Sequence, residues 1–226
     1  MTCRLALQSH MPELVPTFDK LVQLAGGGDR AARLLSLYCP TPYLAGCSQA
    51  IWDRDDRPLL VRNYDYHPGL CEGTILHSSW NGVRAIVQSD SLWGALDGMN
   101  EYGLAVSLAF GGRRTIGEGF GIPLVLRYIL EFCRDTREAR KALERIPTHM
   151  TYNISAVDAT GGAFTAYIAP DRPATFHTHG VSTNHQEDIE WPDHAVATRT
   201  MERHDYLSEK LRSPSETRER FIERFL

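Results

Sequence analysis

A cysteine that directly follows a glycine is the first candidate for chemistry in this sequence. Cys47 follows Gly46 and stands at the start of a predicted strand, with prolines and predicted helices before it. Cleavage of the Gly46–Cys47 bond would give Cys47 both a thiol and a free α-amine, whose ordinary pKa of about 8 makes it a usable base at neutral pH. The alternative is a small buried cysteine on a strand, and the Gly-Cys dipeptide alone does not separate the two.

Charged side chains in the next predicted strand form the second candidate cluster. Alternation along the strand places Arg62 and Tyr64 on one face and Asp65 on the other. In a functional interpretation, Arg62 lowers the pKa of a nearby thiol, and the Asp65 carboxylate receives a proton-bearing amine. The alternative is an edge strand whose charges discourage association.

The sequence predicts helices and antiparallel strands that would position these candidate residues. Residues 11–38 predict two helices separated by Gly26-Gly27-Gly28. Strands are predicted at about 48–54, 58–64, 73–78, 83–88, 103–110, 151–158, 163–168, 174–177 and 180–183, helices from Pro123 to near Arg134 and at about 137–145, and a charged last helix after Arg199. Residues 53–56 and Asn81-Gly82 predict turns. This order favours an α+β fold, a four-layer αββα sandwich of two mainly antiparallel sheets.

Four elements, taken in chain order, resemble one enzyme family. They are Cys47, the cluster from Arg62 to Asp65, the string DGMNEYGL at residues 97–104, which is interpreted as a turn, and the strand end Ser182-Thr183-Asn184-His185. The resemblance is to the penicillin acyltransferase-like and choloylglycine hydrolase group of N-terminal nucleophile (Ntn) hydrolases. It covers about residues 11–210. Arg62 and Asp65 stand 15 and 18 residues after Cys47, a spacing similar to the family's, and DGMNEYGL is its most specific string.

The resemblance implies self-cleavage before Cys47 and thiolate attack on a linear amide or acyl donor through a thioester acyl-enzyme. By that likeness Cys47 is the nucleophile and its α-amine the base, while Arg62 and Asp65 orient and charge the site. Asn184 matches the family's oxyanion donor, and a side-chain NH₂ at a strand end suits that role. Arg203 resembles a further family arginine. Without the family match, Asn184 is a turn residue and Arg203 a solvated helix charge, like Arg199.

The family also implies a division of the chain and a pocket. Residues 1–46 are expected to be a helical N-terminal pro-segment, and residues 47–226 the Ntn-hydrolase-like domain. Candidate pocket walls are Tyr64, Tyr66, Trp80 and Trp93, although aromatic residues on strands more often belong to the core. Asn100 is interpreted as a turn residue and not as a catalytic one. The partner is expected to be a small amide or acyl substrate of undefined identity, with no cofactor and no metal.

Two features depart from the family. Choloylglycine hydrolases carry an asparagine just after the DGMNEYGL string, where this chain reads Leu108-Ala109-Phe110, so that oxyanion donor is missing or replaced by backbone. Family members are longer at both ends, whereas this chain stops in a charged helical run. We therefore expect either a sheet that ends early, truncated toward the C-terminus, or a homo-oligomer in which a second copy pairs with the open edge.

Two other classes of function compete with this interpretation. Four histidines within eighteen residues make a metal-dependent hydrolase the first rival, because histidine pairs on strands bind zinc: His177, His179, His185 and His194. No local cysteine completes the ligand set and no HxxxH pattern lies on a predicted helix. The second rival is a non-catalytic small-molecule binding protein on the same fold.

Composition excludes several partners. The 226 residues are 42% hydrophobic and carry a formal charge of -4, so no basic surplus favours nucleic acid or an anionic membrane. No apolar run is long enough to span a bilayer. The five cysteines are irregularly spaced and fit neither a disulfide framework nor a zinc knuckle. These features predict a cytoplasmic protein.

Overall fold

The computed structural model describes residues 3–54 and 58–225. Its helices are α1 (Cys3–His10), α2 (Val15–Leu24), α3 (Gly28–Ser36), α4 (Ile122–Phe132), α5 (Thr136–Arg145), α6 (Pro192–Ala197), α7 (Thr200–Arg212) and α8 (Arg218–Glu223), with single 3-10 turns at Pro12–Leu14 and Pro68–Leu70. Its strands are β1 (Gly46–Trp52), β2 (Leu59–Asp65), β3 (Thr74–Ser78), β4 (Ala85–Asp90), β5 (Gly94–Asn100), β6 (Ala105–Phe110), β7 (Tyr152–Val157), β8 (Ala163–Ala169), β9 (Arg172–His177) and β10 (Val181–Ser182). The turn predicted at residues 53–56 lies partly outside the described residues.

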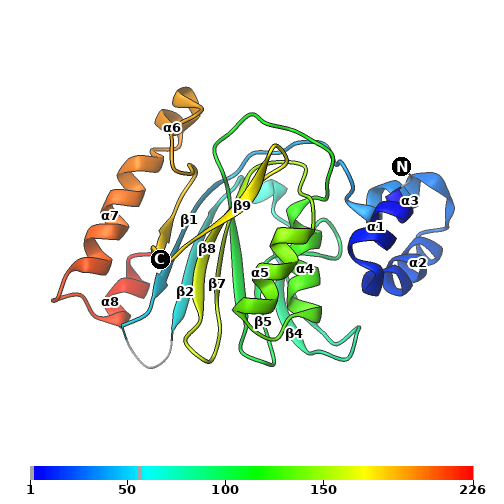
Figure 1. The fold of residues 1–226 in the computed structure, drawn as a ribbon, viewed down its shortest axis with the longest axis horizontal. Helices are drawn as coiled ribbons and strands as arrows, with labels where there is room; N and C mark the ends of the chain where they lie inside the picture. The colour runs from blue at the N-terminus through cyan, green and yellow to red at the C-terminus, as the bar shows by residue number, and fades with distance from the viewer. Residues whose placement is uncertain (1–2, 55–57, 226) are drawn as a thin grey trace.

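Two antiparallel sheets form the centre of the molecule. In the described part of the chain, a large sheet has the order β3-β4-β5-β6-β7-β8-β9 and a small sheet has the order β10-β1-β2. Helices α4 and α5 cover one face of the large sheet, the small sheet packs against its other face, and α7 lies on the outer side of the small sheet (Figure 1). The layers therefore run helix, sheet, sheet, helix, which confirms the predicted αββα sandwich.

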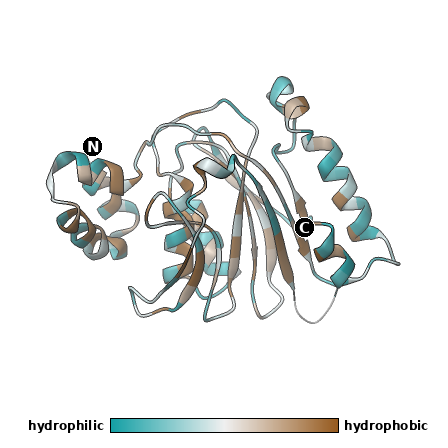
Figure 2. Cartoon of the chain, turned by 180° about the vertical axis from the view of Figure 1, so that it is seen from behind, coloured by the Kyte–Doolittle hydropathy of each residue, from teal (hydrophilic) through white to brown (hydrophobic). Residues whose placement is uncertain are grey.

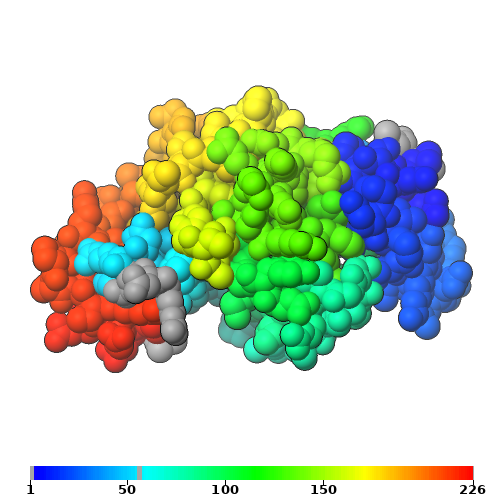
Figure 3. All heavy atoms as spheres, turned by 60° about the horizontal axis from the view of Figure 1, so that its bottom comes forward, coloured from blue at the N-terminus to red at the C-terminus, as the bar shows by residue number. Residues whose placement is uncertain are grey.

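The two ends of the chain lie at opposite ends of the molecule. Helices α1, α2 and α3 pack together at one end, and α6, α7 and α8 lie at the other (Figures 1 and 3). Helix α1, which buries Ala6 and Leu7, was not predicted from the sequence. None of the helices in residues 3–54 and 58–225 is long and apolar enough to cross a membrane.

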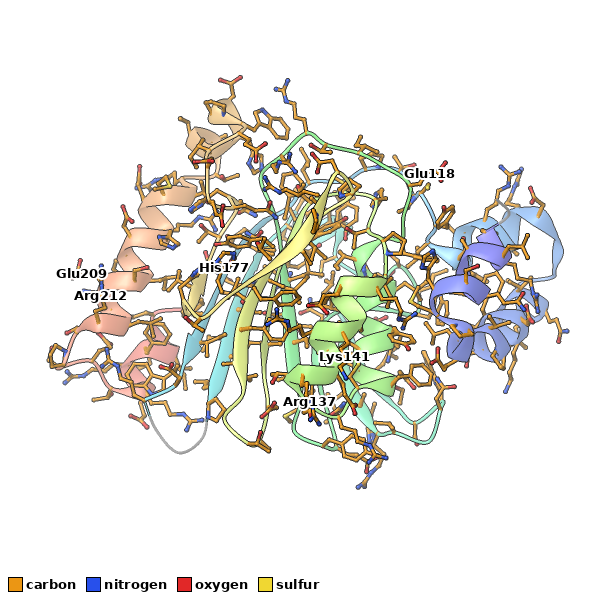
Figure 4. The ribbon with its side chains drawn as sticks, in the orientation of Figure 1. Glu118, Arg137, Lys141, His177, Glu209 and Arg212 are labelled. Carbon is orange, nitrogen blue, oxygen red and sulfur yellow. The ribbon has the colours of Figure 1, made fainter. Side chains whose placement is uncertain are left out.

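The helices that cover the large sheet differ in how much of their surface they bury. All residues of α4 from Ile122 to Glu131 are buried, so it forms part of the main core. In contrast, α5 buries only Ala139, Ala142 and Leu143, while Arg137 and Lys141 project from its outer side (Figure 4). The surface of α7 is mainly hydrophilic (Figure 2), as suits a helix on the outside of the small sheet.

The interpretation of residues 97–104 as one turn was wrong in its first half, because residues 97–100 end β5. This strand pairs with both β4 and β6, and α4 packs closely against it. A Cβ at Gly98 would come within 2.5 Å of the Ile86 carbonyl and 3.0 Å of Leu130, so glycine permits the close approach of α4. The interpretation of Asn100 as a turn residue agrees with the structure, since its side chain accepts the Tyr102 and Leu104 amides and donates to carbonyls at the end of α4.

The small sheet is narrower than the large one and leaves part of it uncovered. Strands β1 and β2 lie over β6 and β7, and within the described residues β2 has no strand beyond it. On the inner face of β3, β4 and β5, Ile75 is therefore 75% exposed, and Ile86 and Met99 are each 52% exposed. These side chains line an open cleft of about 1040 Å³ beside β2, and Arg62 and Asp97 also line it.

Candidate active site

Cys47 lies near the start of β1, with its side chain fully buried between the two sheets. It pairs with Tyr64 of β2 and packs with Ala45 and Ala109. Gly46 pairs with Asp65, and a Cβ on Gly46 would come within 3.1 Å of the Asp65 Cβ. The close pairing of β1 with β2 therefore favours a residue without a side chain immediately before the cysteine.

The Arg62 guanidinium lies between the sheets beside the Cys47 thiol. Its Nη2 is 3.6 Å from the Cys47 Sγ, and its Nη1 forms a 2.7 Å ion pair with Asp97 on β5. Its Nε donates to the Leu108 carbonyl at 2.9 Å, and its central carbon lies 4.5 Å from the centre of the Tyr64 ring. The structure thus brings Arg62 to the predicted cysteine.

Burial dominates the acid–base properties of the thiol. Desolvation raises the pKa of Cys47, and the charge of Arg62 and hydrogen bonds from Arg62 and the Phe110 backbone N–H oppose that effect only in part. The expectation that Arg62 lowers the pKa is therefore right for that contact, but the balance keeps the sulfur in its neutral form in the intact chain. The Phe110 amide also stands where the family's additional asparagine was expected.

Asn184 contacts the backbone on both sides of the Gly46–Cys47 bond. Its side-chain oxygen accepts the Cys47 amide N–H at 2.9 Å. Its NH₂ group donates to the carbonyl of Ala45 at 3.3 Å and to that of Phe110 at 3.0 Å. Asn184 is only 1% exposed, so this arrangement is fixed by buried hydrogen bonds.

Arg203 reaches the same place from α7. It donates to the Cys47 carbonyl at 2.6 Å, to the Ser48 hydroxyl at 2.7 Å and to the Asn184 side-chain oxygen at 2.7 Å. Burial lowers its pKa, although Asp65 and Cys47 raise it. Arg199 instead forms an exposed ion pair with Glu202, so of these two neighbouring arginines it is Arg203 that contacts Cys47.

Asp65 lies on the opposite face of β2 from Arg62, as the alternation predicts. Its carboxylate is 3.4 Å from Arg203, and its side chain is 46% exposed. It lines a second, outward-facing cavity of about 630 Å³ that also contains Gly46 and Arg203. The Cys47 side chain and the Asp65 carboxylate thus lie on different sides of the small sheet, with the Gly46–Cys47 backbone between them.

The four predicted aromatic walls divide into two groups. Tyr64 and Tyr66 stack with ring centroids 5.4 Å apart and pack against the Cys47 cluster. Trp93 is a core residue whose indole N–H donates to the Leu35 carbonyl at 2.8 Å, and Trp80 covers Arg127 at 4.6 Å. Trp80 and Trp93 line neither the cleft beside β2 nor the cavity at Asp65, because their contacts tie them to α4 and α3.

The histidines do not form a metal site. His177, His179 and His185 line a cavity of about 630 Å³ with His204, between β9 and α7, where Figure 4 labels His177 and Arg212. His194 lies apart on α6 and stacks on Trp191. Among the described residues, no group of three or more histidine, cysteine, aspartate or glutamate side chains could hold a metal ion. The described residues therefore lend no support to the interpretation as a metal-dependent hydrolase.

Two side chains near Cys47, those of Asp97 and Tyr43, were not predicted from the sequence. Asp97 pairs with Arg62 and was hidden inside the string interpreted as a turn. Its signal was a carboxylate in a β-run, the same signal that singled out Arg62. Tyr43 lies with its ring centroid 6.4 Å from that of Tyr66 and has a buried hydroxyl without a partner among the described residues. Nothing in the pattern of the loop around Tyr43 indicates that position.

Comparisons with known proteins agree with the fold. The family model for acyl-coenzyme A:6-aminopenicillanic acid acyl-transferase matches residues 52–226, which include Arg62, Asp65, Asn184 and Arg203 and begin five residues after Cys47. The N-acylethanolamine-hydrolyzing acid amidase ortholog of Caenorhabditis elegans has a similar structure, with a TM-score of 0.55 and 14% identity over 78% of this chain and 84% of that one. No curated protein matches the sequence.

Two further solved structures are similar over part of their length. Penicillin V acylase from Agrobacterium tumefaciens has a TM-score of 0.48 and 20% identity, over 67% of this chain and 55% of that one. A mutant of the conjugated bile acid hydrolase from Clostridium perfringens has a TM-score of 0.46 and 14% identity, over 68% of this chain and 57% of that one. The chain thus spans little more than half the length of these two proteins.

Proposed function

The chain belongs to the acyl-coenzyme A:6-aminopenicillanic acid acyl-transferase family, an Ntn-hydrolase family, and on that premise we propose that it is a cysteine amidohydrolase or acyltransferase activated by cleavage of its own Gly46–Cys47 bond. One observation carries the proposal: a buried thiol, a guanidinium 3.6 Å from it and a buried amide that contacts both sides of that bond converge at the start of β1. Residues 1–46 are then a pro-segment, and residues 47–226 the catalytic domain.

Maturation begins at the Cys47 sulfur. The Sγ adds to the Gly46 carbonyl carbon, the thiol proton passes to the Cys47 nitrogen as the carbon–nitrogen bond breaks, and a thioester links Gly46 to Cys47. Water then hydrolyses the thioester, which leaves a carboxylate on Gly46 and restores the thiol next to a free α-amine. Asn184 supports this step because it holds the backbone on both sides of the bond.

Turnover uses the groups that cleavage creates. The α-amine of Cys47 takes the thiol proton, and the thiolate, stabilised by Arg62, attacks the substrate carbonyl. The Asn184 oxygen, which accepts the Cys47 N–H in the intact chain, then orients the amine, and Arg203 fixes that oxygen. Once the Ala45 carbonyl has left, one hydrogen of the Asn184 NH₂ group is free to donate to the oxyanion, and the Phe110 N–H lies nearby, at the Cys47 sulfur. Water or an amine acceptor resolves the thioester.

The cleft beside β2 suits the acyl part of the substrate. It is lined mainly by apolar side chains, among them Leu60, Ile86 and Met99, and it leads to Arg62 next to the thiol. A small acyl donor with an apolar acyl group would remove this exposed surface from water. We therefore propose linear amides of apolar acids as the substrate class.

Intact mass measurement and N-terminal sequencing test the proposal. We expect a fragment that begins at Cys47 together with the 46-residue peptide that precedes it, and Cys47→Ala should abolish both maturation and turnover. Cys133→Ala is the matched control, since Cys133 is also a buried cysteine but lies at the end of α4. A chain that stays whole on prolonged incubation and does not turn over amides would favour a binding protein instead.

A further inference from the structure

We propose that Asp97 is a positioning residue that holds the Arg62 guanidinium against Cys47 and sets how much of its positive charge reaches the thiol. This inference rests on the proposed function, because it gives Arg62 its role beside the nucleophile. Asp97 lies on β5, and its carboxylate accepts from Arg62 Nη1 at 2.7 Å across the space between the sheets.

The guanidinium has a fixed orientation because its contacts differ at each edge. Its Nε is held by the Leu108 carbonyl, its Nη1 by Asp97, and its face by Tyr64. The remaining Nη2 is the group directed at Cys47, 3.6 Å from the sulfur. An arginine fork is planar, so fixing Nε and Nη1 also fixes where Nη2 points.

Asp97 is also the countercharge of Arg62. The Arg62 side chain is 5% exposed, whereas Asp97 is 29% exposed at the cleft. A carboxylate paired with the guanidinium neutralises part of the field that would otherwise stabilise a thiolate. Asp97 thus has two opposing effects on Cys47. Its hydrogen bond directs Nη2 of Arg62 at the sulfur, and its negative charge weakens the stabilisation that Arg62 gives to a thiolate.

Two substitutions separate these effects. Asp97→Asn removes the charge and keeps an oxygen that can accept from Nη1, so we expect the Cys47 thiol to ionise about one pH unit lower than in the unmodified chain. Asp97→Ala removes both charge and acceptor, so Arg62 loses its anchor, and the thiol should ionise at a clearly higher pH than in the Asn variant. Since both variants lack the charge, the difference between them measures positioning alone.

The measurement is a pH titration of ultraviolet thiolate absorbance in the full chain, with the same background carrying Cys47→Ala subtracted. Asp171→Asn is the control, because Asp171 pairs with Arg113 at 2.8 Å in another part of the molecule and should leave the titration unchanged. Thermal unfolding checks that each variant folds. If Asp97→Ala does not fold, Asp97→Ser replaces it.

Either of two results would overturn the proposal. Identical titrations of the Asn variant and the Ala or Ser variant would show that Asp97 does not position Arg62. A thiol that ionises no lower in Asp97→Asn than in the unmodified chain would show that its charge does not act on Cys47. The titration needs no turnover, so a chain without amidase activity would contradict the proposed function and still leave this inference decided.

Discussion

The Arg203 guanidinium donates a 2.7 Å hydrogen bond to the side-chain oxygen of Asn184. The same oxygen accepts the amide N–H of Cys47, and Arg203 also holds the Cys47 carbonyl. The side chain of Arg203, on the outer helix α7, therefore fixes the backbone of Cys47 at the start of β1. The order of the site thus depends on a residue 156 positions away along the chain.

We expect Arg203→Gln to slow maturation and turnover by roughly 10- to 100-fold, because charged hydrogen bonds of this kind each contribute about 1.5–3 kcal/mol. Arg203→Lys should be nearly as slow, since a lysine cannot hold two carbonyl-type oxygens with one planar fork. The measurements are the rate of appearance of the Cys47 fragment and kcat. Arg199→Gln, at a neighbouring arginine with an exposed ion pair to Glu202, is the control and should behave as the unmodified chain. Equal effects of the two glutamine variants would contradict the assignment.

The cleft gives a prediction about substrate preference. Ile86→Arg places a charge in the cleft, and we expect kcat/KM for amides of apolar acids to fall by about tenfold or more, because the acyl group loses apolar contact and meets a solvated charge. The thiolate titration of Cys47 should stay the same. Leu24→Arg, at a 74% exposed leucine on α2, is the control. Unchanged kcat/KM in the Ile86 variant would show that the acyl group binds elsewhere.

Two glycines with positive φ allow the energetic cost of backbone strain to be measured apart from the cost of a steric clash. Gly112 has φ +74°, and a Cβ there would come within 2.3 Å of the Asn184 carbonyl oxygen. Gly26 has φ +90°, with nothing within 4 Å of its Cβ position. We expect Gly26→Ala to cost about 1 kcal/mol of unfolding free energy and Gly112→Ala about 3 kcal/mol or more, because only the second also displaces the backbone of Asn184.

Urea unfolding measures both costs, and maturation should slow only in the Gly112 variant. If both alanine variants lose the same free energy of unfolding and mature normally, the close approach of Gly112 to Asn184 does not contribute to stability or to maturation.

The histidine-lined cavity makes stability depend on pH. Burial and, to a lesser extent, the charge of His204, whose ring centroid is 5.2 Å away, lower the pKa of His185 to about 4. In the unfolded chain, His185 has an ordinary histidine pKa of about 6.5, so between about pH 6.5 and pH 4 the unfolded chain binds a proton there and the folded chain does not. The folded state is therefore destabilised as pH falls from about 6.5 toward 4, and the contribution of His185 to stability is fully present only at neutral pH and above.

We expect the loss between about pH 7 and pH 4.5 to be about 1–2 kcal/mol for His185, after discounting for its partial exposure. It is measured as the difference in unfolding free energy between the unmodified chain and His185→Gln at each pH. His77→Gln, at an exposed histidine of β3, is the control. A difference that does not change with pH would contradict the assignment.

The sequence predicted the layers of the fold because hairpin turns and apolar periodicity are local signals. It missed β5, since Asp97 and Gly98 have low strand propensity and are held in the sheet by their neighbours and by the packing of α4 on Gly98. The sequence also could not show that Trp93, in the turn before β5, is buried against α3, because its partner, the Leu35 carbonyl, is 58 residues away in the chain.

The candidate site was also predictable only in part. Cys47 and Arg62 could be identified by residue type and spacing, and they do lie together. The contacts of Arg203 could not, because they depend on where α7 lies across the small sheet. Nor could the raised pKa of the thiol, which results from burial by residues distant in sequence.

The narrow small sheet has a consequence for how this architecture can diversify. The hollow beside β2 exists because, among the described strands, none fills it, and its far wall is built from β3, β4 and β5, whereas the thiol is carried on β1. Lengthening a hairpin or docking a further strand along that vacant edge would reshape the chamber without moving the Cys47 sulfur. In the proposed enzyme, the side chains of β3 and β4 that bound this chamber could therefore vary without moving Cys47 or the Arg62–Asp97 pair.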